Sequence, residues 1–349
     1  MIELLQKHTV DLYDLKNKEF EFQKISAQEL ITVSRFDLFA KMTYIKHRSS
    51  NPDYAKKIYA EHIKAFNPNL KEPGSEDKNS LEDFIIAFDK LINHFKDNEF
   101  DAEVSLIPVS EGGVILDGSH RLAALAYFKK EVSILKFKRV EPIAKFDYCY
   151  FISRGLLIET ADKITYEAVH FVDNLFIACL WPKMGSIRDR SFARDYFKEH
   201  FDLLYRKDLK MSLNNLSMFI YKIYNHQDWV GTKENNFTGA RNKAFSCYGT
   251  DKTLQFIIFK SSSLEEVIKA KDTIRAFYQL EKHALHITDN DEETKEIIDL
   301  ILTDKVHDYK IGTARFIDKI NEFKTLVMNV YLINLKVKVA YYLNKMGLY

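Results

Sequence analysis

A run that reads as strand, turn and helix constrains the fold of this chain more than any other feature. Residues 114–116 are apolar and typical of a strand, and Asp117 and Gly118 after them are typical of a tight turn. Ser119 can cap a helix, and residues 122–126 are small or aliphatic, as on the packed face of a helix. This order predicts a fold in which strands and helices alternate.

The start of this predicted helix is suited to binding an anion such as phosphate. Unpaired backbone N–H groups and the positive end of the helix dipole lie there. His120 and Arg121 add side-chain donors. The alternative is an ordinary connection between a strand and a helix, with solvated His and Arg side chains. These residues alone leave both interpretations open.

Composition narrows the class of protein. The chain has 349 residues, 46% of them hydrophobic, which is enough for one large domain or for two or three smaller ones. Its 51 basic and 50 acidic residues nearly cancel, which argues against nucleic acid as a partner. Cys149, Cys179 and Cys247 are too far apart for a metal knuckle and odd in number for a disulfide framework. We therefore expect a globular protein of a reducing cytoplasm.

No stretch of the sequence predicts a membrane span or a secretory signal. Residues 1–22 are studded with charges and lack an apolar segment of signal-peptide length. Residues 326–343 are apolar but interrupted by Asn and Lys, so they fall short of the about 20 apolar residues of a membrane helix. We expect residues 314–346 to form one or two helices that pack on the protein or join two copies as a homodimer.

Acidic side chains occur in a loop that precedes the turn. Residues 67–80 are rich in Pro, Gly and charge, and loops of this length often bind ligands. Their Glu72 and Glu76 are candidate general bases, although a solvated charged loop is the commoner case. His62, on the apolar stripe of a predicted helix, is expected to be a packed, hydrogen-bonded histidine. Arg35 is either a surface or capping residue or a part of the site.

Strand patterns divide the chain. We predict strands at residues 104–109, 114–116 and 132–140, with a hairpin between the first two and a helix between the last two. After Pro142 the pattern restarts with a predicted strand at 148–152. The predicted organisation is α/β (α+β), with an N-terminal domain at 1–145, a second α/β domain at 146–312 and a C-terminal helical segment at 313–349.

In the second half of the chain, predicted strands and predicted helices alternate more regularly. Strands at 253–259 and 284–287 are each followed by a predicted helix, a pattern typical of α/β domains. Asp289 follows the second of these strands, where α/β folds bind ligands, yet it may equally cap the next helix. A buried strand at 175–181 precedes the cation-rich residues 183–194, which are either a phosphate-binding loop or a solvated one.

A polar loop with two glycines is a candidate second binding site. It runs from residue 228 to a predicted helix start and carries Trp229, Lys233, Arg241 and Lys243. Loops of this composition can cradle a ligand. The sequence Gly-Lys-Ser/Thr is absent, so the loop is not a Walker A motif.

Residues 117–124, DGSHRLAA, resemble the Asp-Gly-x-His-Arg signature of the ParB/sulfiredoxin-like superfamily. That superfamily includes chromosome-partition proteins, sulfiredoxins and free-serine kinases, and its motif binds nucleotide phosphates. The motif here has no Cys, which argues against sulfiredoxin chemistry. The region after Pro142 lacks a basic surplus and DNA-reading helices, which argues against DNA partition. The metabolite-kinase branch remains.

This resemblance implies roles for particular residues. In the kinase branch the Asp, His and Arg of the motif manage phosphate and metal, and an upstream carboxylate takes the proton of the substrate hydroxyl. Here Asp117 would hold Mg²⁺ and act in catalysis together with His120, and Glu72 or Glu76 would be the base. The expected phosphate-binding set is Gly118, Ser119, His120, Arg121 and Arg35.

The whole chain also resembles bacterial proteins often seen among surface-polysaccharide genes, which join such a domain to a second α/β domain. The supporting stretches are 35–38 with Lys41, 61–63, 117–124, 228–231, 239–240 with Lys243, and 286–289. We therefore expect a kinase that uses ATP or ADP and Mg²⁺ to phosphorylate a small hydroxylated metabolite or sugar, in service of polysaccharide biosynthesis. The alternative is a nucleotide-binding scaffold without turnover. DNA binding is a third and weaker alternative.

Overall fold

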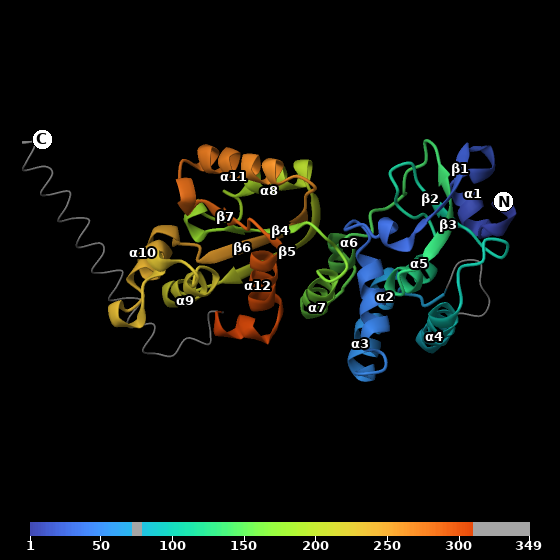
Figure 1. Cartoon of the computed structure of the whole chain (residues 1–349), viewed down its shortest axis with the longest axis horizontal. Helices are drawn as coiled ribbons and strands as arrows, with labels where there is room; N and C mark the ends of the chain where they lie inside the picture. The colour runs from blue at the N-terminus through green and yellow to red at the C-terminus, as the bar shows by residue number, and fades with distance from the viewer. Residues whose placement is uncertain (72–78, 310–349) are drawn as a thin grey trace, which may run out of the picture. The chain divides into compact units, whose positions relative to one another are not determined.

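Two separate β-sheets organise the structure, with helices packed around each of them (Figure 1). The computed structural model describes residues 1–71 and 79–309, and the fold is mixed α and β. One unit comprises Met1–Leu175 with the short segments His200–Tyr205 and Ile258–Ser262, and the other comprises the remaining residues. Glu72, Glu76 and the segment predicted as a helical C-terminus at 313–349 lie outside the described residues. Within the described ranges, no helix is long and apolar enough to cross a membrane.

The sheet of the first unit has the strand order β1-β3-β2. Strand β1 (Phe20–Ser26) runs antiparallel to β3 (Glu131–Phe137), with Gln23 opposite Ile134. Strand β2 (Ile107–Val109) runs parallel to β3, and helix α5 (Ser119–Tyr127) makes the crossover between them. A βαβ unit is therefore present, but its first strand is formed by residues 107–109 and not by the predicted strand at 114–116.

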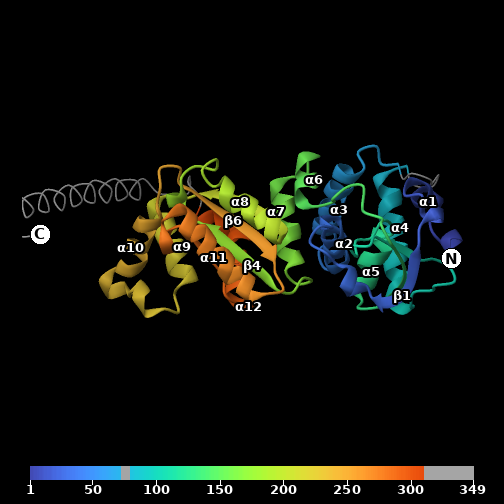
Figure 2. The same ribbon diagram turned by 90° about the horizontal axis from the view of Figure 1, so that it is seen from above.

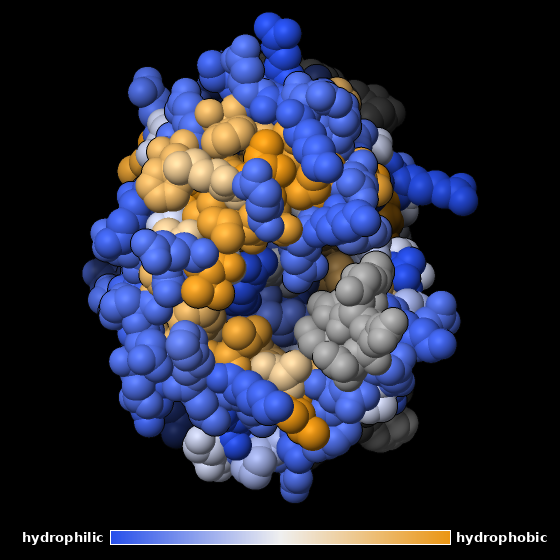
Figure 3. All heavy atoms as spheres, turned by 90° about the vertical axis from the view of Figure 1, so that its right-hand side faces the viewer, coloured by the Kyte–Doolittle hydropathy of each residue, from blue (hydrophilic) through white to orange (hydrophobic). Residues whose placement is uncertain are grey.

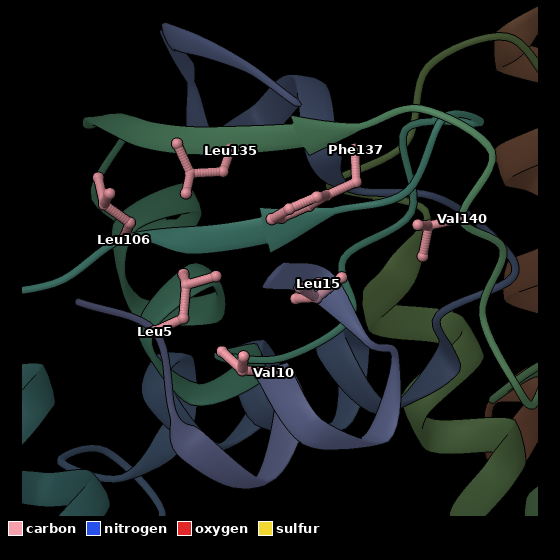
Figure 4. Close-up of a cluster of buried hydrophobic side chains, with 7 residues drawn as sticks. All are labelled: Leu5, Val10, Leu15, Leu106, Leu135, Phe137 and Val140. Atoms are coloured by element: carbon pink, nitrogen blue, oxygen red, sulfur yellow. The ribbon is translucent and has the colours of Figure 1, made fainter. Parts of the chain in front are cut away.

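The central strand β3 is buried on both faces. Because alternate side chains of a strand point to opposite faces, Leu135 and Phe137 lie together on one face. They pack with Leu106 and Val140 against apolar side chains of the N-terminal helical turns (Figure 4). The full cluster is Leu5, Val10, Leu15, Leu106, Leu135, Phe137 and Val140.

Helices cover the rest of the first sheet. Their starts follow from local capping: Asn51 caps α3 ahead of a proline, and Ser80 caps α4, because each side chain accepts a backbone N–H of the first turn. The helices are α1 (Lys7–Leu12), α2 (Phe36–His47), α3 (Pro52–Phe66), α4 (Leu81–Asp97), α5, α6 (Tyr148–Ser153) and α7 (Ile158–Ala168), with 3₁₀ turns η1 (Ile2–Leu4), η2 (Leu15–Asn17) and η3 (Ala27–Leu30).

Two predicted strands of this unit are absent from the structure. Residues 148–152, predicted as a strand, form helix α6, which Asp147 caps by accepting the N–H of Tyr150. Residues 114–116 form no strand either, because only an isolated bridge joins Ile115 to Val109. Helix α7 packs on α2 and α3, and Glu167 of α7 pairs with Lys46. These contacts bring α6 and α7 into the first unit, past the boundary predicted at residue 145.

The second sheet has the strand order β5-β6-β4-β7. Its central strands, β4 (Leu175–Leu180) and β6 (Thr253–Lys260), are nearly continuous apolar runs, as expected where both faces are covered. Strand β5 (Asp202–Lys210), which the sequence did not predict, is an edge strand whose buried and exposed residues partly alternate. Strand β7 (Leu285–Ile287) is short and antiparallel to β4.

Helices lie on both faces of this second sheet, with α8 and α11 on one face and α9 and α12 on the other (Figure 1; Figure 2 shows α11 above β4 and β6). The predicted α/β alternation of the last third is therefore present. The helices are α8 (Ser191–His200), α9 (Leu213–Ile223), α10 (Thr238–Cys247), α11 (Leu264–Tyr278) and α12 (Asp291–Leu302), with 3₁₀ turns η4 (Pro182–Met184), η5 (Asp228–Val230), η6 (Lys233–Asn235), η7 (Glu281–His283) and η8 (Asp304–Asp308).

Candidate functional site

The predicted turn lies at the start of α5, at the end of a loop that backbone hydrogen bonds hold in place. The N–H of Ser110 donates to the carbonyl of Val114 at 2.8 Å, and the N–H of Leu116 donates to the carbonyl of Pro108 at 2.9 Å. Gly118 then has φ 82° and ψ 26°, the left-handed region that a residue with a Cβ rarely adopts. A Cβ at this position would also lie 2.9 Å from Nη2 of Arg121. The turn therefore depends on glycine.

Gly118, and not Ser119, is the N-cap of α5. Ser119 is already the first helical residue, and no side chain of the described residues caps this N-terminus. The prediction that Ser119 caps the helix was wrong, because the left-handed glycine makes the turn one residue earlier. The N-terminus of α5 thus keeps its positive end without a capping oxygen.

Asp117 and Arg121 flank the turn. Their Oδ2 and Nη2 atoms are 3.8 Å apart, within ion-pair distance but too far for a hydrogen bond. Nη1 of Arg121 donates to Oγ of Ser105, which anchors the guanidinium. Oδ2 of Asp117 is buried, and no hydrogen-bond partner for it exists among the described residues. A buried carboxylate oxygen without a partner is a costly arrangement that a bound cation or donor would relieve.

His120 is held by aromatic residues of α3 and α4. Its Nε2 is 2.8 Å from the hydroxyl of Tyr59, and which of the two donates depends on the tautomer. The edge of Phe88 packs against the imidazole with ring centroids 4.8 Å apart. Tyr59 stacks on Phe88 in turn at 5.5 Å. The imidazole therefore has a fixed orientation at the first turn of α5.

Arg35 lies buried behind the turn. Its guanidinium makes two hydrogen bonds to the carboxylate of Asp37, of 2.7 and 2.9 Å, and a third of 2.7 Å to the carbonyl of Ile115. Lys41 Nζ donates to the same carboxylate at 3.0 Å. Arg35, Asp37 and Lys41, which we call the buried ion cluster, are at most 5% exposed. Arg35 thereby supports the backbone two residues before Asp117.

The buried ion cluster holds two cations against one carboxylate. Burial alone would raise the pKa of Asp37, but Arg35 and Lys41 outweigh it and hold that pKa well below its usual range. Burial lowers the pKa of Lys41, and Asp37 opposes this shift. The carboxylate of Asp37 is therefore ionised and is the group that makes the burial of both cations tolerable.

His62 lies beside this cluster, fully buried among aromatic rings that include Phe66 and Phe151. The sequence predicts a hydrogen-bonded histidine here, yet neither ring nitrogen has a hydrogen-bond partner among the described residues. Burial, together with the charge of Lys41, lowers the pKa of His62 well below the ordinary 6.5. The imidazole is therefore neutral in the folded protein near pH 7.

His62→Leu is expected to flatten the loss of stability on acidification. Below pH 6.5 an unfolded histidine takes up a proton that folded His62 does not, so the free energy of unfolding falls as the pH falls, by up to about 1.4 kcal/mol per pH unit. Urea unfolding at several pH values between about 7 and about 5 measures the slope. The exposed His94→Leu is the matched control and should keep the wild-type slope. An unchanged slope in His62→Leu would contradict this assignment.

The face of the first unit drawn in Figure 3 is hollowed near its middle, with hydrophilic atoms on its floor and apolar patches around it. Small-molecule sites are usually concave and combine apolar walls with a few polar groups. Among residues 1–71 and 79–309, no group of three or more His, Cys, Asp or Glu side chains is placed to hold a metal ion.

The second-site candidates separate into two sets. Trp229 and Lys243 line one cavity in the second unit. Lys233 and Arg241 are exposed and do not line it. Asp289 lies at the end of β7 and pairs with Lys271 at 2.7 Å, also away from the cavity lining. The predicted loop is largely helical, because η5, η6 and the start of α10 lie within it.

Sequence reasoning missed several residues of both sites. Tyr59 and Ser105, which orient His120 and Arg121, carry no motif, and only their place in the fold identifies them. In the second unit, Arg275 and Lys282 share the cavity with Lys243 although they are more than 30 positions later in the chain.

Comparison of the chain with protein-family models, with curated proteins and with solved structures finds no match.

Proposed function

We propose that the chain is a nucleotide-dependent phosphotransferase whose phosphate-binding element is the turn from Asp117 into α5. The reaction moves a phosphoryl group from ATP or ADP to a hydroxyl group of a small metabolite or sugar. This is the activity implied by the likeness of residues 117–124 to the metabolite-kinase branch of the ParB/sulfiredoxin-like superfamily. A role in polysaccharide biosynthesis follows only from the second resemblance, to bacterial proteins of surface-polysaccharide genes.

The observation that carries the proposal is the buried Oδ2 of Asp117, which has no hydrogen-bond partner among the described residues and lies beside a helix N-terminus without a side-chain cap. The positive end of α5 and the guanidinium of Arg121 favour an anion at this place. The carboxylate of Asp117 favours a cation. A phosphate group that carries a divalent cation satisfies both requirements at once.

Asp117 fits a magnesium ion of the kind that accompanies nucleotides. Mg²⁺ is usually bound by one or two carboxylates and completes its octahedral shell with phosphate oxygens and water. Asp117 would supply the carboxylate, because the lone pairs of its Oδ2 are not engaged by the described residues. Bound there, the ion would supply charge neutralisation for the phosphates.

His120 would accept the proton of the substrate hydroxyl. The imidazole, which Tyr59 orients, can act as a general base through the ring nitrogen that carries its lone pair. The hydroxyl oxygen then forms a bond to the terminal phosphorus, the bond from that phosphorus to the bridging oxygen breaks, and ATP leaves as ADP. Glu72 and Glu76 remain alternative bases outside the described residues. Arg121, anchored by Ser105, keeps a cation at the turn.

A scaffold that binds nucleotide without turnover is the second candidate. It is favoured by the internal pairing of the turn, because Arg121 already donates to Ser105 and His120 already contacts Tyr59. Side chains ordered in this way can hold a ligand without moving. The two candidates share a binding site and differ only in whether nucleotide is consumed.

Phosphorus NMR of the full chain with ATP, Mg²⁺ and a panel of sugars and hydroxylated metabolites tests the proposal. We expect ATP to become ADP with a new phosphate-ester signal, and Asp117→Asn to abolish it. Asp289→Asn, which alters an exposed aspartate in the other unit, is the matched control and should keep full turnover. Binding without consumption would leave only the scaffold. If the chain neither binds nor consumes the nucleotide, both candidates are overturned.

A further inference from the structure

The second unit contains a cavity of about 470 Å³, a volume in the range of small-molecule sites. One face of α10 supplies part of its wall, since its lining residues 239, 242, 243 and 246 recur at helical spacing. The segment 281–285 that leads into β7, α11 and the end of α9 supply the rest. All lining residues belong to the second unit, whereas the turn at Asp117 belongs to the first.

The polar lining of the cavity is cationic. Lys243, Arg275, Lys282 and His283 line it, and no described residue among the lining carries a carboxylate. Nε of Arg275 is buried without a hydrogen-bond partner among the described residues, and its Nη2 makes only a long 3.4 Å contact with the carbonyl of Leu285. Donors that are buried and unsatisfied in this way are costly unless a ligand accepts from them.

Two of the basic groups that line the cavity, Lys243 and His283, have lowered pKa values. Burial lowers the pKa of Lys243, the thiol of Cys247 opposes this shift, and Lys282 and Arg275 add to it. Burial also lowers the pKa of His283, and the cations Lys243 and Lys282 add to that shift. An anion placed between these groups would remove their mutual repulsion.

Aromatic rings supply the remaining recognition surface. Trp229 is 43% exposed, and its indole N–H is already satisfied by Gln227 at 2.9 Å, so the ring face is what it offers to a ligand. Tyr224 lies next to it with ring centroids 5.2 Å apart. A planar heterocycle can stack on such a surface while charged groups hold its phosphate.

We propose that this cavity binds a nucleotide, with the phosphate held by Lys243, Arg275 and Lys282 and the base stacked on Trp229. Arg and Lys are the usual partners of phosphate, and no side chain that lines the cavity carries a carboxylate, the group by which proteins usually bind Mg²⁺. Binding here is therefore independent of Mg²⁺. This site is additional to the proposed phosphotransfer, whose nucleotide requires Mg²⁺ and Asp117.

Calorimetric titration of the full chain with AMP and UMP in EDTA tests the proposal, with tryptophan emission recorded in parallel. The two tryptophans of the chain are Trp229, which lines the cavity, and the buried Trp181, whose ring centroid is 6.0 Å from Nζ of Lys243, so a change in emission reports on binding at the cavity. We expect saturable binding of at least one nucleotide. Lys243→Met, Arg275→Met and Lys282→Met should each weaken it about ten-fold or more. Lys282 is exposed, so its variant keeps the fold.

Arg241→Met is the matched control, because Arg241 is an exposed cation of the same helix that does not line the cavity, and this variant should bind as the wild type. Adenosine, uridine and inorganic phosphate alone should each bind at least about ten-fold more weakly than the nucleotides. The proposal fails if neither nucleotide binds in EDTA, if Lys282→Met binds as the wild type, or if a nucleoside or phosphate alone binds equally well. Asp117→Asn leaves this binding unchanged, which separates it from the proposed phosphotransfer.

Discussion

Asp37→Ala is expected to lower the free energy of unfolding by about 3–5 kcal/mol, because it removes the only carboxylate of the buried ion cluster. Arg35 and Lys41 would then remain in a low-dielectric interior without a counter-charge. The lost hydrogen bonds, three of them within 3.0 Å, could not be replaced by water, since all three side chains are at most 5% exposed.

Lys41→Met is the informative comparison for this change. It removes one of two cations and leaves the Arg35–Asp37 pair intact and electrically balanced, so its cost should be clearly smaller than that of Asp37→Ala. Urea unfolding curves of the two variants and the wild type give both values. Equal losses, or a loss below about 1 kcal/mol in Asp37→Ala, would contradict the role given to Asp37.

Asp37→Ala should also disturb the backbone geometry of the predicted turn. Without its partner, Arg35 no longer holds the carbonyl of Ile115 in the geometry that precedes Asp117. The buried ion cluster is thus a support of the candidate site as well as a part of the core. An arginine of this kind positions the site without contacting a ligand.

Gly239→Ala is expected to destabilise the second unit by about 2–3 kcal/mol, as overpacking does in a tight core. A Cβ at this position would lie 1.7 Å from the carbonyl oxygen of Trp229, which is backbone and cannot turn aside. Helix α10 would have to move away from η5, and the cavity wall would move with it. In an ordinary helix the same substitution stabilises by about 1 kcal/mol, so the sign of the effect is itself a test.

The effect of Gly239→Ala is measured by thermal and urea unfolding, with Gly112→Ala as the matched control. Gly112 has no atom closer than 3.9 Å to its built Cβ, so alanine there should be nearly neutral. A stabilised or unchanged Gly239→Ala would mean that α10 does not approach Trp229 as closely as described. Nucleotide binding in EDTA should be weakened in the same variant.

The sequence predicts correctly those helices and strands for which the capping residue and the hydrophobic periodicity indicate the same element. Ser80 caps α4, and the helix predicted after residues 284–287 is present as α12, with Asn290 rather than the candidate Asp289 as its cap. These helices pack an apolar stripe against the core, so pattern and tertiary structure favour the same state. Strands β4 and β6 are found as predicted for a similar reason, because their continuous apolar runs fill central positions of the second sheet.

Elements with competing signals were mispredicted. Residues 148–152 are aromatic and β-branched enough to resemble a strand, yet the Asp147 cap and the packing of Phe151 favour a helix. Strand β5 was missed because charged residues occupy its exposed positions as an edge strand. In both cases tertiary contacts, which lie outside the local pattern, decide the outcome.

For the candidate sites too, the sequence predicts local features but not the contacts between residues far apart in the chain. The motif at residues 117–121 predicts a turn into a helix, and the structure places that turn between β2 and α5. The burial of Arg35 could not be read from its neighbours, because its partner carbonyl at Ile115 is 80 positions away. The cations of the cavity likewise come from α10, α11 and the approach to β7, and only the fold brings them together.

The central claim is that the turn from Asp117 into α5 binds the phosphates of a nucleotide with Mg²⁺. Calorimetric titration of Mg²⁺ and ADP into Lys243→Met, which disables the cavity of the second unit, tests it most directly. We predict one binding site in Lys243→Met and binding weakened about ten-fold or more when Asp117→Asn is added. Absence of binding in Lys243→Met, or equal binding after Asp117→Asn, would contradict the claim.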